Sequence, residues 1–133
     1  TRLGSSSFRW SEIWCATGLN QSSDKRLKKD IISLSSALDK VMKMNPVSYH
    51  WIKGDNHTHL GFLAQELEMV LPEIVRKPQA ARNDYDGRTP PSDGDMYAVN
   101  YSEIIPVLVK AMQEQQAQIK TLEQKIAVLE QNK

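Results

Sequence analysis

The sequence predicts an α+β domain, mainly helical with a few short strands, that ends in a long coiled-coil helix. Three observations predict this class: a heptad pattern over the last third, an amphipathic pattern stopped by Pro46, and short β-branched or aromatic runs between turns. We expect a β-rich segment at 1–22 that belongs to the end of an upstream domain. The domain proper then covers 23–133, with its C-terminal helix at 102–131.

Composition excludes several classes of function. The 133-residue chain has a net charge of +1, which gives no general attraction to nucleic acid or to a membrane surface. No apolar run approaches the ~20 residues that span a bilayer. Cys15 is the single cysteine, so no intrachain disulfide can form, which fits a reducing compartment. The chain begins on Thr1, which favours a fragment of a longer protein.

The first helical pattern follows a segment without helix signals. Around Trp10 the apolar residues partly alternate with polar ones, which predicts a short strand or an extended edge within 1–22. Residues 33–44 place apolar residues at i, i+3, i+4 and i+7, which predicts a helix with Ser33 or Ser35 as its N-cap.

The middle of the chain alternates between short strands and turns. Proline and glycine punctuate it, and its strands are rich in β-branched and aromatic residues. We expect strands at 47–52, 73–77 and 96–100, a turn at 53–58, a helix from about 64 to 71 ended by Pro72, and a long loop at 78–95.

The last third carries an unbroken heptad seam. Its apolar residues are separated alternately by three and four positions, on a stretch without Gly or Pro after Pro106 in the first turn. The residues of this seam are Ile105, Leu108, Met112, Gln115, Ile119, Leu122, Ile126 and Leu129.

A seam this narrow predicts association with other helices, because an isolated helix is only marginally stable. The alternative is a helix that packs the seam on the core of its own domain. Ile at position a with Leu at position d favours two strands, and the polar Gln115 at d can set register and oligomer number. The residue pattern by itself therefore favours a dimer.

The stretch SSDKRLKK, residues 22–29, has two interpretations. Charged runs at a domain boundary are usually solvated linkers. Ser23 and Lys28 could instead form a nucleophile and its base, since a serine hydroxyl attacks only when a base accepts its proton.

Four motifs in order resemble the C-terminal intramolecular chaperone domain of phage tailspikes and tail fibres, the endosialidase-type or peptidase S74 domain. They are SSDKRLKKDI, ALDKVMKMNPVSYHW, HLGFLAQELEMVLPEIV, and YAVNYSEIIPVLVKAMQEQQAQIKTLEQKI. The resemblance covers about residues 23–133. It implies a homotrimer, in place of the dimer, that assists folding of an upstream fibre of the same chain.

The resemblance also implies release of the domain by self-cleavage. The catalytic dyad would be Ser23 and Lys28, with His59 assisting, and the cleavage site would lie at Ser22, Ser23 and Asp24. Assembly would take place in the host cytoplasm. The upstream fibre would remain in the virion tail, and the released domain would be absent from the mature virion. The alternative is a trimerisation or receptor-binding tip that stays attached.

The chemistry of such a dyad requires a neutral amine. A lysine in water is protonated at pH 7, and keeping it neutral costs roughly 4.6 kcal/mol. Burial and neighbouring cations such as Lys25, Arg26 and Lys29 favour the neutral form, whereas Asp24 and Asp30 oppose it. We therefore expect burial on assembly to activate the site.

The sequence leaves two candidates for the scissile bond beside Ser23. Attack on the preceding carbonyl passes through a five-membered ring and severs Ser22–Ser23, whereas attack on its own carbonyl needs a strained four-membered ring. Attack from a neighbouring chain could reach either bond. His59 could donate to the oxyanion or assist the water that resolves the ester.

We expect no metal and no cofactor. Asp55, His57 and His59 lack further ligands at usable spacing, and His50 fits a packed or surface histidine on a strand. The glycines form no phosphate-binding motif. Some members of the family respond to ATP, and the residues here carry no motif that predicts it.

Overall fold

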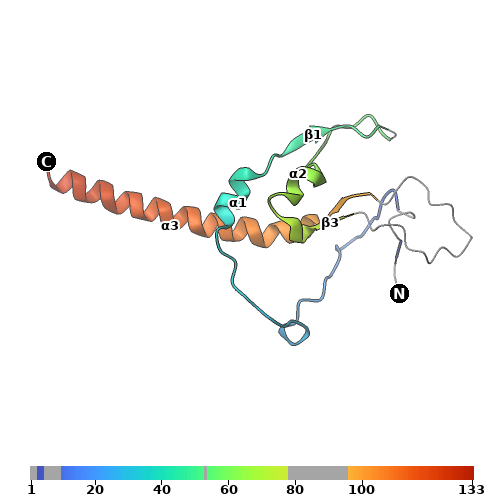
Figure 1. Ribbon diagram of the computed structural model, residues 1–133, viewed down its shortest axis with the longest axis horizontal. Coiled ribbons are helices and arrows are strands. Elements are labelled where there is room, and N and C mark those ends of the chain that lie inside the picture. Colours follow the sequence, from blue (N-terminus) through green and yellow to red (C-terminus); the bar gives the residue numbers. More distant parts are fainter. Residues whose placement is uncertain (1–2, 5–9, 53, 78–95) are drawn as a thin grey trace, which may run out of the picture. The chain divides into compact units, whose positions relative to one another are not determined.

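The computed structural model describes residues 3–4, 10–52, 54–77 and 96–133 (Figure 1). The chain divides into two units. The junction unit comprises Thr1–Ser33 with Lys77–Met96, and the core unit comprises Leu34–Arg76 with Tyr97–Lys133. The loop expected at 78–95 lies outside the described residues.

The strand expected near Trp10 is not formed in the described part of the junction unit. Residues 10–22 carry no strand, and Trp14 is 90% exposed. An unpaired strand leaves its backbone N–H and C=O groups without partners, and the described residues of this unit contain no strand with which the segment could pair. The described helical element of this unit is the short 3-10 helix η1, Lys25–Leu27.

Three α-helices lie in the core unit. They are α1 (Ala37–Lys43), α2 (Ala64–Glu68) and α3 (Ile104–Gln131), and a 3-10 turn η3 (Tyr101–Glu103) leads into α3. The long C-terminal helix expected at 102–131 is confirmed. The helix α1 begins later than expected, because Ser36 adopts a left-handed conformation with φ of 53° and forms the boundary.

Two short hairpin-like sheets connect these helices. Strand β1 (Val47–Tyr49) pairs antiparallel with β2 (His59–Gly61), and β3 (Val75–Arg76) pairs antiparallel with β4 (Ala98–Val99). The expected strands are thus present but shorter than predicted. The short 3-10 helix η2 (Pro72–Ile74) separates α2 from β3.

The core of this unit gathers around the first third of α3. The helix α1 packs along α3 (Figure 1), and α2 contributes Leu67 to the same buried cluster. Burying these apolar side chains is the dominant stabilising contribution. The buried residues are Ala37, Leu67, Leu71, Ile74, Val75, Ile104, Val107 and Ala111.

A carboxylate from α3 caps the N-terminus of α1. The Ser36 side chain makes no capping hydrogen bond. The Leu38 N–H instead donates to Glu114 Oε2 at 2.8 Å, across 76 positions of sequence. This hydrogen bond, with smaller contributions from the Ala37 N–H and Lys110, holds the pKa of the Glu114 carboxyl below its ordinary value. The contact satisfies a helix-end donor and fixes α1 on α3.

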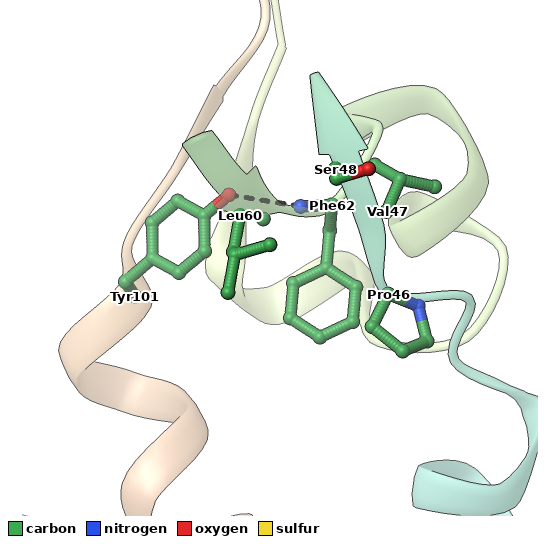
Figure 2. Close-up of a pocket in the computed structure, with 7 residues that line it drawn as sticks. Pro46, Val47, Ser48, Leu60, Phe62 and Tyr101 are labelled. Carbon is green, nitrogen blue, oxygen red and sulfur yellow. Dashed lines mark hydrogen bonds between the residues drawn. The ribbon is translucent and has the colours of Figure 1, made fainter. Parts of the chain in front are cut away.

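A tyrosine hydroxyl joins η3 to β2. Figure 2 shows the Tyr101 ring beside Leu60 and Phe62, with its hydroxyl accepting the Phe62 N–H at 3.0 Å. These residues line an open apolar hollow of about 400 Å³. A Cβ at Gly61 would lie 2.5 Å from the Tyr101 hydroxyl, so only glycine leaves room for it.

The heptad seam is not the face that α3 packs on its own unit. The buried stripe is Ile104, Val107 and Ala111, one position before Ile105, Leu108 and Met112 of the seam. The apolar seam residues are 41–68% exposed. Beyond Glu114, α3 extends away from the other elements of the core unit (Figure 1). Within the described residues, no helix is both long and apolar enough to cross a bilayer.

Replacing Gly61 with alanine should destabilise the core unit by about 1–3 kcal/mol, because the new methyl group displaces the Tyr101 hydroxyl. Tyr101→Phe should cost about 0.5–1.5 kcal/mol through loss of the hydrogen bond to Phe62. In the Tyr101→Phe background, the cost of Gly61→Ala should fall by at least about 0.5 kcal/mol. Denaturant unfolding of the four chains at equal concentration measures this coupling, and additive costs would contradict the proposed clash.

Replacing Glu114 with glutamine should lower the Tm by about 4–8 °C at neutral pH, because α1 loses its charged cap. The native pKa of Glu114 is lowered from 4.5. Its contribution is therefore complete above that value and is lost as the pH falls through the native pKa. The difference in Tm between wild type and Glu114→Gln should shrink below about pH 4.5. Glu130→Gln, near the exposed end of the same helix, is the control and should change the Tm little at either pH.

Candidate active site

The turn η1 brings Ser23 and Lys28 together. The Leu27 N–H donates to the Asp24 carbonyl and the Lys28 N–H to the Lys25 carbonyl, both at 3.1 Å. This tight turn reverses the chain over five positions. Lys28 Nζ then lies 2.7 Å from Ser23 Oγ, within hydrogen-bonding distance. The two residues that sequence analysis paired are in contact.

The carboxylate of Asp24 is directed to Arg26 in this turn. Asp24 Oδ1 accepts the Arg26 backbone N–H at 2.8 Å, and Asp24 Oδ2 accepts the guanidinium at 2.7 Å. The Arg26 guanidinium, followed by the Arg26 backbone N–H, holds the pKa of Asp24 below its ordinary value. Asp24, the acidic residue next to Ser23 in sequence, is thus paired with a cation other than Lys28. This arrangement weakens the electrostatic objection to a neutral Lys28.

The dyad is exposed in the single chain, as are all of residues 22–35. The contact is a hydrogen bond from the Lys28 ammonium to the Ser23 hydroxyl. A catalytic contact runs the other way, because a base must accept the hydroxyl proton. The distance between Lys28 Nζ and Ser23 Oγ is short enough for proton transfer. A neighbouring surface that excludes water would be needed to favour the neutral amine of Lys28.

His59 belongs to the core unit, whereas Ser23 and Lys28 belong to the junction unit. On β2, His59 Nε2 lies 3.0 Å from Asp55 Oδ1, and the side chain is 33% exposed. Its ring stacks on Tyr49 with centroids 5.6 Å apart and meets Trp51 edge-on at 6.2 Å. The histidine is therefore held by a carboxylate and two aromatic rings.

The other histidines have structural contacts. His50 Nε2 lies 3.2 Å from Thr58 Oγ1 across the β1–β2 hairpin, and the His57 backbone N–H donates to Asp55 Oδ1 at 3.2 Å. Among the described residues, no group of three or more His, Cys, Asp or Glu side chains is placed to hold a metal ion.

Residues 23–76 match the model of the family described as chaperone of endosialidase, peptidase S74. This segment belongs to that family. The family match begins at Ser23, the serine of the contact with Lys28, and includes His59. The resemblance drawn from the sequence motifs is thereby confirmed.

Curated phage proteins contain similar segments. The chain is 34% identical over 108 residues to the long tail fiber protein Gp37 of Enterobacteria phage K3, and equally to that of phage T2, which covers 78% of the chain. Gp37 of Salmonella phage S16 is 37% identical over 71 residues, or 48% of the chain. The chain spans 8%, 7% and 9% of these proteins, respectively.

A solved structure shares the fold. It is described as the carboxy-terminal domain of the bacteriophage T5 L-shaped tail fiber with its intra-molecular chaperone domain. The match covers 96% of this chain and 37% of that chain, with a TM-score of 0.56 and 15% sequence identity. At this identity, the likeness concerns the fold alone.

Sequence analysis missed three contacts around these residues. The Asp24–Arg26 pair was treated as separate charges, although side chains two apart across a tight turn can meet. Asp55 was considered for metal binding and not as the partner of His59. The Tyr101 contact with Phe62 joins residues 39 positions apart, and no local pattern signals it.

Proposed function

We propose that this chain is the C-terminal intramolecular chaperone of a phage tail fibre or tailspike. It trimerises, assists folding of an upstream fibre, and is released by autoproteolysis beside Ser23. The contact of 2.7 Å between Ser23 Oγ and Lys28 Nζ carries the proposal, because it joins a nucleophile to its base where the family match begins. The Gp37 relatives and the T5 tail fiber structure support the fibre context.

The exposed seam of α3 supports trimerisation. The helix rises about 42 Å over its 28 residues, and the seam runs almost its full length. Leaving so many large apolar side chains in water is unfavourable, and packing them against equivalent helices removes that cost. The family implies three copies.

Assembly then controls cleavage. In a single chain, water surrounds the dyad and favours the Lys28 ammonium. In the trimer, neighbouring chains and the folded fibre exclude water from the junction, so that the neutral amine becomes accessible. Cleavage thus follows correct assembly.

The reaction is an acyl transfer followed by hydrolysis. Lys28 accepts the Ser23 hydroxyl proton, and the oxygen attacks the carbonyl carbon of Ser22. The peptide C–N bond breaks, its nitrogen takes up a proton, and an ester remains at Ser23. Water then adds to the ester carbonyl and its C–O bond breaks, which regenerates the hydroxyl and leaves a carboxyl on Ser22. His59 assists the water or the oxyanion.

Ser23→Ala should abolish cleavage, and Lys28→Ala should slow it about 100-fold or more, because the hydroxyl loses its base. Lys28→Arg keeps the positive charge but cannot accept a proton, so it should be equally inactive. Denaturing gels and mass spectrometry of the chain, alone and joined to an upstream fibre, measure the product. Cleavage at Ser22–Ser23 gives residues 23–133.

Lys43→Ala, at an exposed lysine at the end of α1, is the matched control and should cleave at the wild-type rate. Cleavage that persists in Lys28→Arg would refute the dyad. A wild-type chain that stays whole when joined to its fibre would instead support the attached trimerisation or receptor-binding tip.

Ile126→Asp should convert trimers into monomers, because a carboxylate is costly in an apolar seam. Cleavage should be lost together with assembly. Native mass spectrometry reports both the number of copies and the state of the chain. Gln124→Asp, placed away from the seam on the same helix, should leave both unchanged. A monomeric Ile126→Asp chain that cleaves at the wild-type rate would contradict control by assembly.

A further inference from the structure

Two columns of side chains flank the apolar seam of α3. With the seam residues at heptad positions a and d, the flanking positions are e and g. The e column consists of Val109, Gln116, Glu123 and Glu130, and the g column consists of Ala111, Gln118, Lys125 and Asn132. Beyond Glu114, all residues of both columns are exposed in the single chain. Their charges are therefore free to act on a second copy of the helix.

Lys125 is the basic residue of these columns, and its own helix offers it no acidic partner. Side chains on one helix meet at spacings of three and four positions. The residues at these spacings from Lys125 are Thr121, Leu122, Val128 and Leu129. Among the residues that the structure describes, no ion pair involves Lys125. A carboxylate that neutralises this lysine on α3 must therefore come from another chain.

An open hollow of about 420 Å³ lies beside Lys125. Its lining residues are Ala117, Gln118, Thr121, Leu122 and Lys125. The Thr121 hydroxyl is directed to its own backbone, since Oγ1 donates to the Ala117 carbonyl at 3.0 Å. Because Gln118 and Lys125 are g residues, the hollow lies on the g side of the seam. A parallel neighbouring helix covers this side with its e residues.

The two columns complement each other when the copies run parallel. In a parallel coiled coil, each g residue faces the e residue of the next heptad on the neighbouring helix. With the copies in register, Lys125 faces Glu130 of the neighbouring copy, and Gln118 faces Glu123 of that copy. The first contact pairs opposite charges, and the second joins an amide donor to a carboxylate.

Other alignments lack these contacts. An antiparallel pair places e beside e and g beside g, but the e column has no basic residue and the g column has no acidic one. A parallel pair shifted by one heptad places the Gln115 amide against Leu108 or Leu122. Burying an amide without a hydrogen-bond partner is costly. Charge and polarity therefore both favour the parallel, in-register alignment.

We propose that Lys125 forms an ion pair with Glu130 of the neighbouring copy, and that this pair sets the parallel, in-register order of the assembled helices. The proposal rests on the assembly in the proposed function and names the contact that orders its copies. The pair recurs at each helix–helix interface, so contributions that are small singly add up. Parallel order places the core units of all copies at the same end of the helices.

Charge reversal tests the pair in the Ser23→Ala chain, in which cleavage cannot interfere. Lys125→Glu should raise the concentration at which half of the chains are assembled about threefold or more, because the new carboxylate faces Glu130. Glu130→Lys should have a similar effect. The double variant should return to within about twofold of the parent chain, since the two charges are exchanged. Analytical ultracentrifugation measures these concentrations, and the differences should shrink in about 1 M salt.

Lys120→Glu is the matched control, because it makes the same change of charge at position b, outside both columns. It should assemble like the parent chain. An equal mixture of Lys125→Glu and Glu130→Lys chains, one of them labelled with nitrogen-15, should form mixed assemblies in preference to either chain alone. Native mass spectrometry resolves these species and shows that the pair joins different chains.

The outcomes separate this inference from the proposed function. If the parent chain forms trimers and Lys125→Glu assembles as readily as Lys120→Glu, the inference is overturned and the trimeric chaperone stands. A double variant that fails to recover also overturns the inference. Assembly into two copies with the expected charge response supports the ion pair and overturns the trimer. A parent chain that stays monomeric overturns both.

Discussion

The packing of α1 on one stripe of α3 is the interaction on which the core unit depends. Ile104, Val107 and Ala111 of α3 lie in the same buried cluster as Ala37 of α1. Glu114 closes the contact by capping α1. Because the neighbouring stripe differs by a single position, about 100° around the helix, it stays exposed. One helix therefore holds its own domain on one stripe and leaves a second apolar stripe exposed.

The candidate site depends on local contacts, whereas the core unit depends on contacts between residues far apart in sequence. The contact of Ser23 with Lys28 requires only a short 3-10 turn and the Asp24–Arg26 pair, all within six residues. The geometry of the site is local. The proposed role of Lys28 as a base requires burial, and both side chains are exposed in the single chain. In the proposed autoproteolysis, this separation of geometry from activation would delay the single cleavage until folding is complete.

The sequence predicted the elements that depend on periodicity. The heptad pattern predicted α3 to within a few residues. Pro46 predicted the end of α1, whereas α2 ends at Glu68, before the end expected at Pro72. Prediction failed where the deciding contact is non-local. Ser33 and Ser35 were plausible caps, but the cap of α1 comes from Glu114. The strand near Trp10 depends on a partner strand, and the described part of its unit contains none. Tyr101 explains why Gly61 precedes Phe62, and only the folded chain brings them together.

Glu114 divides α3 into two parts. The part before it packs on the core unit and is called the base, and the part after it is exposed to solvent and is called the rod. Everything after that carboxylate is exposed in the single chain, so the rod can be lengthened or replaced in whole heptads without disturbing the base. A single inserted residue just after it would rotate the rod by about 100° and separate its apolar face from Ile105 and Leu108. The rod can therefore be replaced by a helix of another length, provided that its heptad positions stay in phase with those of the base.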